Sequence, residues 1–162
     1  MGFDELRLLQ LSYWDLGGAV RQGRLVVHRD HADEIVGVFQ RLFEARFPIE
    51  RMELVDRFGA DDDASMAANN TSAFNCRPVS GTDRYSEHAY GRAVDLNPRF
   101  NPWVHAGRVD PPNGAPYVDR ARERPGMISA GDTAVTGFAA IGWVWAGMRQ
   151  SPDYQHFSPS GR

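Results

Sequence analysis

The sequence predicts an α+β fold in which helices pack on a central antiparallel sheet. One segment with helical spacing of apolar residues is followed by a short apolar run, and strand-like segments recur towards both ends of the chain. The connections between these elements are too irregular for repeated β-α-β units, which argues against a parallel sheet. A chain of 162 residues has the usual length of one domain, so we expect a single domain over 1–162.

The first half of the chain contains one clear strand and one clear helix. Residues 24–28 form a run rich in β-branched side chains, which favours a strand. Asp30 is placed to cap the helix that follows, and Pro48 should end it near Phe47. A second short strand is expected over residues 52–55. Apolar residues at offsets of three and four carry the helix prediction: Ile35, Val36, Val38, Phe39, Leu42, Phe43 and Phe47.

The second half contains longer irregular segments. Residues 59–70 are polar, so we expect an exposed segment, either helical or looped. Its acidic triplet 61–63 lacks the spaced oxygen ligands of a calcium loop and is expected to be a solvated turn. Residues 99–130 are rich in proline and glycine, and an irregular segment of this length is often functional. We therefore expect part of it to form the rim of a cleft. A helix is expected from a cap at Asp132 to Ala140, followed by an aromatic strand over 142–145.

Composition excludes several classes of protein. With 21 acidic against 18 basic residues, the net charge of −3 gives no electrostatic basis for binding nucleic acid. No run approaches the ~20 apolar residues that a membrane-spanning helix needs, so we expect no membrane insertion. The single cysteine, Cys76, excludes a framework of internal disulfides. The first six residues lack the basic and then apolar profile of a secretory signal.

Chemistry concentrates first around a histidine and an aspartate in residues 86–98. In a strand, Val94 and Leu96 would face the core while Asp95 points to the opposite face. Gly91 permits a sharp turn that would fold His88 back over that face. An imidazole and a carboxylate that converge in this way supply two of the three protein ligands of a catalytic zinc site.

A second segment, close to the C-terminus, supplies the third ligand, His156. Three protein ligands leave the fourth position of zinc to water, which distinguishes catalytic from structural sites. Asp153, three residues earlier, is then placed to act as general base. An offset of three puts two strand residues on opposite faces, so we expect a turn or bulge near Asp153. His28, His31 and His105 have no such acidic partner, and we expect them at the surface.

These motifs resemble those of a known family. The chain is similar to the zinc-dependent peptidoglycan peptidases of the D-alanyl-D-alanine carboxypeptidase group, above all VanY-like carboxypeptidases and the L-alanyl-D-glutamate endopeptidases of phage endolysins. Residues 70–79 and 46–49 also resemble this group, so the similarity covers about residues 23–157. The motifs that carry it are Ser86-x-His88-x-x-Gly91-x-Ala93-x-Asp95 and Asp153-x-x-His156.

The resemblance implies a fold and a set of roles. The fold would be the α+β fold shared with the hedgehog signalling domain, holding one zinc ion through His88, Asp95 and His156. Asp153 matches the catalytic acid, which is often glutamate in relatives, so the shorter side chain must approach more closely. Arg77 matches the arginine that polarises the scissile carbonyl, and Ser86 matches a residue near the substrate backbone. Aromatic side chains near the site would line a peptide groove, although core packing explains each of them equally well: Tyr85, Tyr90, Trp103, Tyr117 and Tyr154. Of these, Tyr85 is expected to bind substrate.

The implied activity is that of a zinc metallopeptidase. Metal-activated water would hydrolyse peptide bonds in the stem peptides of peptidoglycan, by either carboxypeptidase or endopeptidase action. Because peptidoglycan lies outside the membrane, we expect an extracytoplasmic location, in the cell envelope or secreted, with a targeting segment absent from this chain.

Two other functions remain open at this stage. The first is a non-catalytic binding or signalling module of the same fold, in which zinc contributes only to stability. The second is a cysteine peptidase with Cys76 as nucleophile, beside Arg77, which would favour the thiolate. We expect Cys76 to be semi-buried, which argues against that role.

Overall fold

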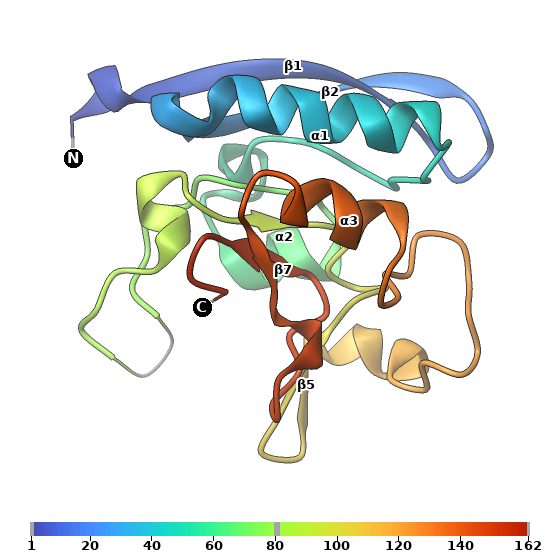
Figure 1. The fold of residues 1–162 in the computed structure, drawn as a ribbon. Helices are drawn as coiled ribbons and strands as arrows, with labels where there is room; N and C mark the ends of the chain where they lie inside the picture. The colour runs from blue at the N-terminus through green and yellow to red at the C-terminus, as the bar shows by residue number, and fades with distance from the viewer. Residues whose placement is uncertain (1, 80–81, 162) are drawn as a thin grey trace.

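The computed structural model describes residues 2–79 and 82–161 and has an α+β fold (Figure 1). Instead of one central sheet, the described residues form three small antiparallel sheets. The strands are β1 (Leu6–Trp14) with β2 (Val20–His28), then β3 (Val94–Asp95), β7 (His156–Ser158) and β6 (Val144–Trp145) in that spatial order, and β4 (Trp103–His105) with β5 (Arg108–Asp110). The α-helices are α1 (Ala32–Glu44), α2 (Asp62–Ala67) and α3 (Thr133–Ala139).

Six short 3-10 helices complete the described secondary structure: η1 (Phe3–Glu5), η2 (Arg29–His31), η3 (Val55–Phe58), η4 (Glu87–Tyr90), η5 (Pro112–Tyr117) and η6 (Ala146–Met148). Within the described part of the chain, no helix is both long enough and apolar enough to cross a membrane.

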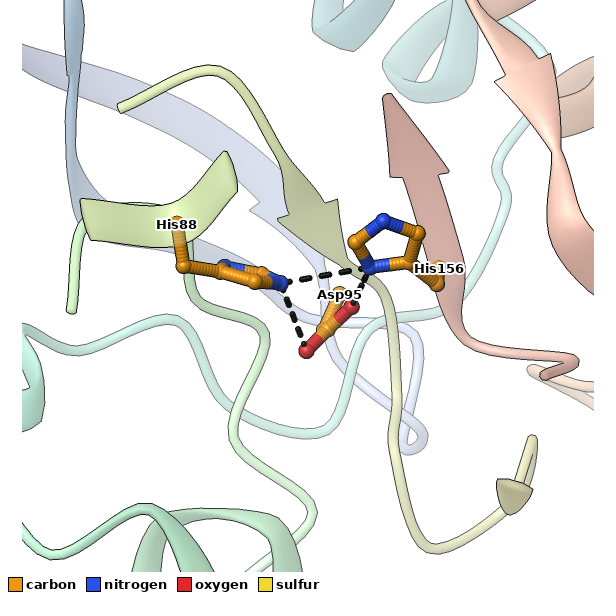
Figure 2. A group of neighbouring side chains, drawn as sticks. All are labelled: His88, Asp95 and His156. Atoms are coloured by element: carbon orange, nitrogen blue, oxygen red, sulfur yellow. Dashed lines mark hydrogen bonds and ion pairs between the residues drawn. The ribbon is translucent and has the colours of Figure 1, made fainter. Parts of the chain in front are cut away.

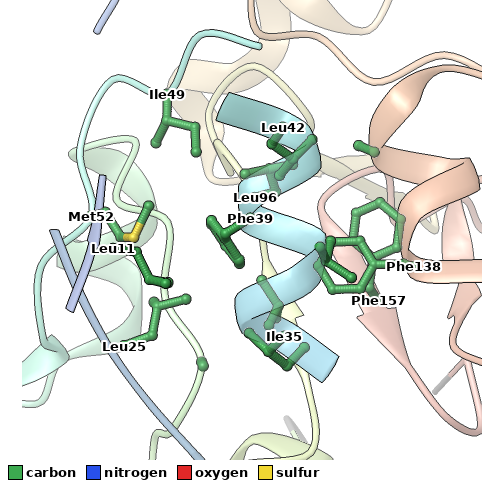
Figure 3. Packing of buried hydrophobic residues seen from close by; sticks show 14 of the residues in the cluster. Leu11, Leu25, Ile35, Phe39, Leu42, Ile49, Met52, Leu96, Phe138 and Phe157 are labelled. Atoms are coloured by element: carbon green, nitrogen blue, oxygen red, sulfur yellow. The ribbon is translucent and has the colours of Figure 1, made fainter. Parts of the chain in front are cut away.

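Helix α1 joins the two halves of the core. Its apolar face is buried between the β1–β2 hairpin on one side and α3 with the three-stranded sheet on the other (Figures 1 and 3). Phe39 lies at this junction, and beyond it the rings of Phe138 and Phe157 stack with centroids 4.1 Å apart. Because Phe157 belongs to β7, the strand that begins with His156 is anchored directly in the core.

The first strand and helix lie where the sequence predicts them, but the strand is longer than predicted and the helix ends at Glu44, before the predicted end near Phe47. The strand predicted over 24–28 is the second half of β2. It pairs in full register with β1, a strand that was not predicted from the sequence. The helix begins at Ala32 with His31 as its capping residue, so the prediction of Asp30 as N-cap is wrong. Asp30 instead lies in η2, where its N–H donates to Nδ1 of His28.

Two predictions between residues 52 and 70 are wrong. No strand forms over 52–55, since Asn70 bonds both the N–H and the carbonyl of Glu53 through its side chain and η3 begins at Val55. Residues 59–70 take the helical alternative in α2, but the expected exposure is wrong for four of them, which are buried: Ser65, Met66, Asn69 and Asn70. In the acidic triplet, Asp61 caps α2 by accepting a hydrogen bond from Ala64 N–H, and Asp62 pairs with Arg77.

The segment 99–130 is more ordered than its composition predicts. It contains the β4–β5 hairpin and η5. Asn101 ties it to the central strand region, because its side chain donates to the carbonyls of Leu96 and Gly126 and accepts from Ile128 N–H. The elements predicted after it are confirmed as α3, capped by Asp132 as predicted, and as the two-residue strand β6.

Gly91 is placed where only glycine fits. It ends η4 with φ of +65°, and a Cβ atom there would lie 2.6 Å from the backbone nitrogen of His28. Gly59 has a similar φ of +69°, with nothing within 4 Å of the added atom.

We expect Gly91→Ala to destabilise the protein by at least about 2 kcal/mol more than Gly59→Ala, because only the first substitution adds a backbone clash to the left-handed strain. Urea unfolding of both variants measures the difference. Equal losses would contradict the close packing of η4 against β2.

Candidate active site

Three buried side chains from separate elements converge on one point (Figure 2). His88 comes from η4, Asp95 from β3 and His156 from the start of β7. Nε2 of His88 lies 3.1 Å from Oδ2 of Asp95, and Nδ1 of His156 lies 2.9 Å from Oδ1. The two ring nitrogens are 3.2 Å apart. We call these three residues the metal triad.

The backbone brings the triad together in the way the sequence predicts. Asp95 and His156 are direct partners in the antiparallel pair β3–β7. On its other side, Asp95 exchanges two backbone hydrogen bonds with Ser72, so β3 is held from both edges. Val94 and Leu96 are fully buried in the apolar core, while Asp95 points to the face that His88 covers.

The hydrogen bonding of His88 prepares it to hold a metal ion. Its Nδ1 lies 2.6 Å from the carbonyl oxygen of Ala73, an acceptor, so this nitrogen carries the proton. Nε2 therefore presents a lone pair to the other two residues, which is the usual arrangement of a metal-binding histidine. In a tetrahedral zinc site with bonds of about 2.0–2.1 Å, ligand atoms stand about 3.3 Å apart. The separations of 2.9 to 3.2 Å within the triad fit that geometry.

Asp95 stays ionised although it is buried. Burial alone would raise the pKa of its carboxyl group, but the positive charge that His88 and His156 carry when both ring nitrogens are protonated, together with their hydrogen bonds, outweighs burial and holds that pKa well below its usual range. The triad therefore offers one carboxylate and two imidazoles, a donor set that zinc favours.

Asp153 lies close to the triad in a different electrostatic state. Its backbone forms a bridge with Trp103, and bends at Tyr154 and Gln155 separate it from β7, so the predicted turn is confirmed. Its Oδ1 is buried and has no hydrogen-bond partner among the described residues. Burial raises the pKa of Asp153 to about 7, although the charge of His156 opposes the shift. A carboxyl group with this pKa can both take and release a proton near neutral pH.

The triad and Asp153 line a cleft of about 300 Å³. Arg77 lines the same cleft, and its guanidinium is fixed by an ion pair of 2.8 Å with Asp62. Ser86 also lines it, but its hydroxyl accepts a hydrogen bond from His88 N–H and so caps η4. The cleft thus contains an anionic, a cationic and a metal-binding group together.

The structure does not bring every candidate to this cleft. Tyr85 is 55% exposed and lines a separate shallow hollow together with Tyr90. Of the aromatic candidates in the described chain, Trp103 lines the cleft, whereas Tyr117 and Tyr154 do not. Tyr85 therefore does not line the cleft with the triad, in contrast to the expected groove.

Two further expectations about the other titratable side chains are wrong. His28 is 3% exposed, not a surface residue, because Gly91 packs on its backbone and Asp30 N–H bonds its ring. Cys76 is exposed, not semi-buried, and within the described residues it does not line the cleft. His105 stacks on Trp103 with ring centroids 3.6 Å apart.

Several residues that line the cleft were not identified as site residues from the sequence, among them Asp62, Asp110 and Gln155. Asp62 and Asp110 line the wall around Arg77, and burial together with the charge of Asp63 raises the pKa of Asp110. Gln155 lines the cleft beside the triad. Asp62 and Asp110 carry no local motif, whereas the position of Gln155 directly before His156 was a usable signal.

Comparison with known proteins places part of the chain in a family. Residues 80–159 match the family model described as D-alanyl-D-alanine carboxypeptidase. The matched region contains all three residues of the metal triad and Asp153, while Arg77 and Ala73 precede it. No curated protein and no solved structure matched the chain.

We expect His156→Ala to weaken zinc binding by at least about 100-fold, since it removes one of three ligands. Competition with a coloured chelator measures the affinity, and His105→Ala is the matched control because His105 lies outside the triad. Equal zinc affinity in the two variants would exclude the triad as the metal site.

We expect Asp153→Asn to stabilise the metal-free protein. The folded pKa of about 7 exceeds the unfolded value, so the folded state binds a proton that the unfolded state releases, and wild-type stability falls as pH rises between about 4 and 7. The gain in the free energy of unfolding caused by Asp153→Asn should therefore be larger at pH 8 than at pH 5, by more than about 1 kcal/mol. Urea unfolding measures it, with exposed Asp119→Asn as control, and a gain independent of pH would contradict the raised pKa.

Proposed function

Because residues 80–159 form a domain of the D-alanyl-D-alanine carboxypeptidase family, we propose that the chain is a zinc-dependent peptidase of peptidoglycan. Its reaction is the hydrolysis of peptide bonds in stem peptides, as a D,D-carboxypeptidase or an L-alanyl-D-glutamate-type endopeptidase. The observation that carries the proposal is the convergence of His88, Asp95 and His156 beside Asp153 in one cleft.

The triad holds the zinc ion in this proposal. Nε2 of His88, Nδ1 of His156 and the Asp95 carboxylate are the ligand atoms, and the Ala73 carbonyl orients His88. The chemistry that bound zinc supplies in such a site is Lewis acidity towards a carbonyl group and towards water. The protein contributes the burial of all three ligands and leaves the approach from the cleft open to substrate.

Asp153 is the proposed general base and acid. Its carboxylate takes the proton of the attacking water and then delivers that proton to the departing amine. The raised pKa suits both steps, and Oδ1 is not held by any hydrogen bond to the described protein. The turn at Tyr154 and Gln155 brings the short side chain of Asp153 to the cleft. The peptidases that the sequence resembles often have the longer glutamate at this position.

Arg77 is the proposed electrophilic residue. Its guanidinium stabilises the negative charge that develops on the carbonyl oxygen, an effect worth about two to three decades of rate for one well-placed donor. The ion pair with Asp62 and the hydrogen bond from Asn75 to Asp62 restrict its motion in the cleft wall. Ser86 and Tyr85 remain proposed substrate-binding residues, Ser86 from inside the cleft and Tyr85 from its surroundings.

The remaining features of the proposal concern the whole chain. We propose one zinc peptidase domain over 1–162 with the hedgehog and D,D-peptidase type of fold, supported by a core that runs from β1 to β7. Since the substrate lies outside the cytoplasmic membrane, we also propose an extracytoplasmic location.

A non-catalytic zinc module is the second candidate function. Zinc alone would explain the triad, but it would not explain a buried carboxyl group with a pKa near 7 and a fixed arginine in the same cleft. A cysteine peptidase is disfavoured by position, because Cys76 is exposed and lies outside the cleft lining in the described residues.

We expect zinc-loaded protein to release peptide fragments from defined muropeptides, and Asp153→Asn to lower kcat by at least about 100-fold with zinc content unchanged. Mass spectrometry of the products identifies the bond. Loss of one terminal alanine indicates carboxypeptidase action, and cleavage within the stem indicates endopeptidase action. Exposed Asp119→Asn is the control.

Cleavage by Asp153→Asn at the wild-type rate would contradict the role of this carboxylate. If zinc-loaded wild type cleaved no muropeptide, the non-catalytic module would replace the proposed function.

A further inference from the structure

Gln155 is buried directly beside the metal triad, and the proposed mechanism does not use it. The residue is 2% exposed and lines the cleft. Its backbone is held in place, because its carbonyl accepts a hydrogen bond of 3.0 Å from Leu96 N–H. Its backbone is therefore fixed directly before β7, next to His156.

The carboxamide of Gln155 differs from the other buried carboxamides of the core region. Its Oε1 is buried and accepts no hydrogen bond from any residue that the structure describes. Elsewhere the chain satisfies both ends of such groups with backbone and side-chain partners, in Asn69, Asn70, Asn97 and Asn101. Gln155 therefore does not serve the fold as these asparagines do.

A buried acceptor without a donor destabilises the folded state. A methionine would fill the same space without that cost, so packing does not explain a glutamine here. Because Gln155 lines the cleft, the missing donor has to come from a molecule that occupies the cleft.

Two other buried polar atoms of the cleft residues also lack a partner in the described chain: Nε of Arg77, a donor, and Oδ1 of Asp153, an acceptor. A peptide group carries one N–H donor and one carbonyl acceptor. The cleft therefore offers a donor and an acceptor that complement the backbone of a bound peptide.

We propose that Gln155 is a substrate-binding residue whose Oε1 accepts a hydrogen bond from a backbone N–H of the bound peptide. This inference rests on the proposed peptidase function and extends it, because it assigns a backbone contact to a residue between the general base and a zinc ligand. It makes the cleft selective for peptide over ester linkages at one position of the substrate.

The first test measures the protein without substrate. Gln155→Met should unfold at the wild-type temperature or above, since it removes an acceptor that nothing satisfies. Asn101→Leu, the matched control, should unfold at a clearly lower temperature because it removes bonds to Leu96, Gly126 and Ile128. A loss for Gln155→Met as large as that of the control would overturn the proposal, since it would show a structural role.

The second test measures peptide binding. We expect Gln155→Met to lower kcat/KM for the cleaved muropeptide by about 3- to 10-fold, the effect of one neutral hydrogen bond, with zinc content unchanged. A series of substrates in which one amide at a time is replaced by an ester locates the contact. For the substrate in which the contacted amide is replaced by an ester, Gln155→Met should no longer lower kcat/KM. An equal effect on every member, or none on the parent peptide, would overturn the proposal.

Calorimetric binding of the same peptides to zinc-loaded Asp153→Asn separates this proposal from the function on which it rests. If the wild-type protein binds peptide but cleaves none, the proposed function fails. In that case the contact is still supported if adding Gln155→Met to the Asp153→Asn variant weakens peptide binding by 3- to 10-fold. Unchanged affinity in that variant, or no peptide binding at all, overturns the contact itself.

Discussion

The contact on which the rest of the site depends is the antiparallel pairing of Asp95 with His156. It joins residues 61 positions apart in the chain and places a carboxylate within 2.9 Å of an imidazole. Both strands are short, so their register is set by the packing of Val94, Leu96 and Phe157 in the core. A shift of one residue would turn Asp95 into the core and direct an apolar side chain at His88.

The site combines rigid support with unsatisfied atoms. Its ligands are held by backbone pairing, by the Ala73 carbonyl and by a network of buried asparagines that ties residues 48–53, 65–71, 97–101 and 126–128 together. Against this background, the unpartnered atoms of Asp153, Gln155 and Arg77 are concentrated in the cleft. Such a distribution is expected where a fold gives up stability for binding and chemistry.

The matched family region accounts for only part of this arrangement. Residues 80–159 carry the triad and Asp153, but the preceding residues hold them in place. Ala73 orients His88, Ser72 pairs with Asp95, and the carbonyl of Gly91 accepts the N–H of His28 at the end of β2. The N-terminal hairpin and α1 thus position the site through the shared core although they contribute no ligand.

The sequence by itself determined the α+β class, the helix over α1 and the cap at Asp132, because each depends on local spacing and residue chemistry. It also identified the three residues of the candidate metal site, through their residue types and the resemblance of their motifs to a known family. It did not reveal β1, the absence of a strand over residues 52–55 or the true cap of α1, since these depend on partners such as β2, Asn70 and His28 that are distant or compete with the local pattern. Only the tertiary structure decided that Tyr85 does not line the cleft and that Asp62, Asp110 and Gln155 do. The physical reason is that a cleft is formed by several separate segments, and which side chains line it depends on how those segments pack together.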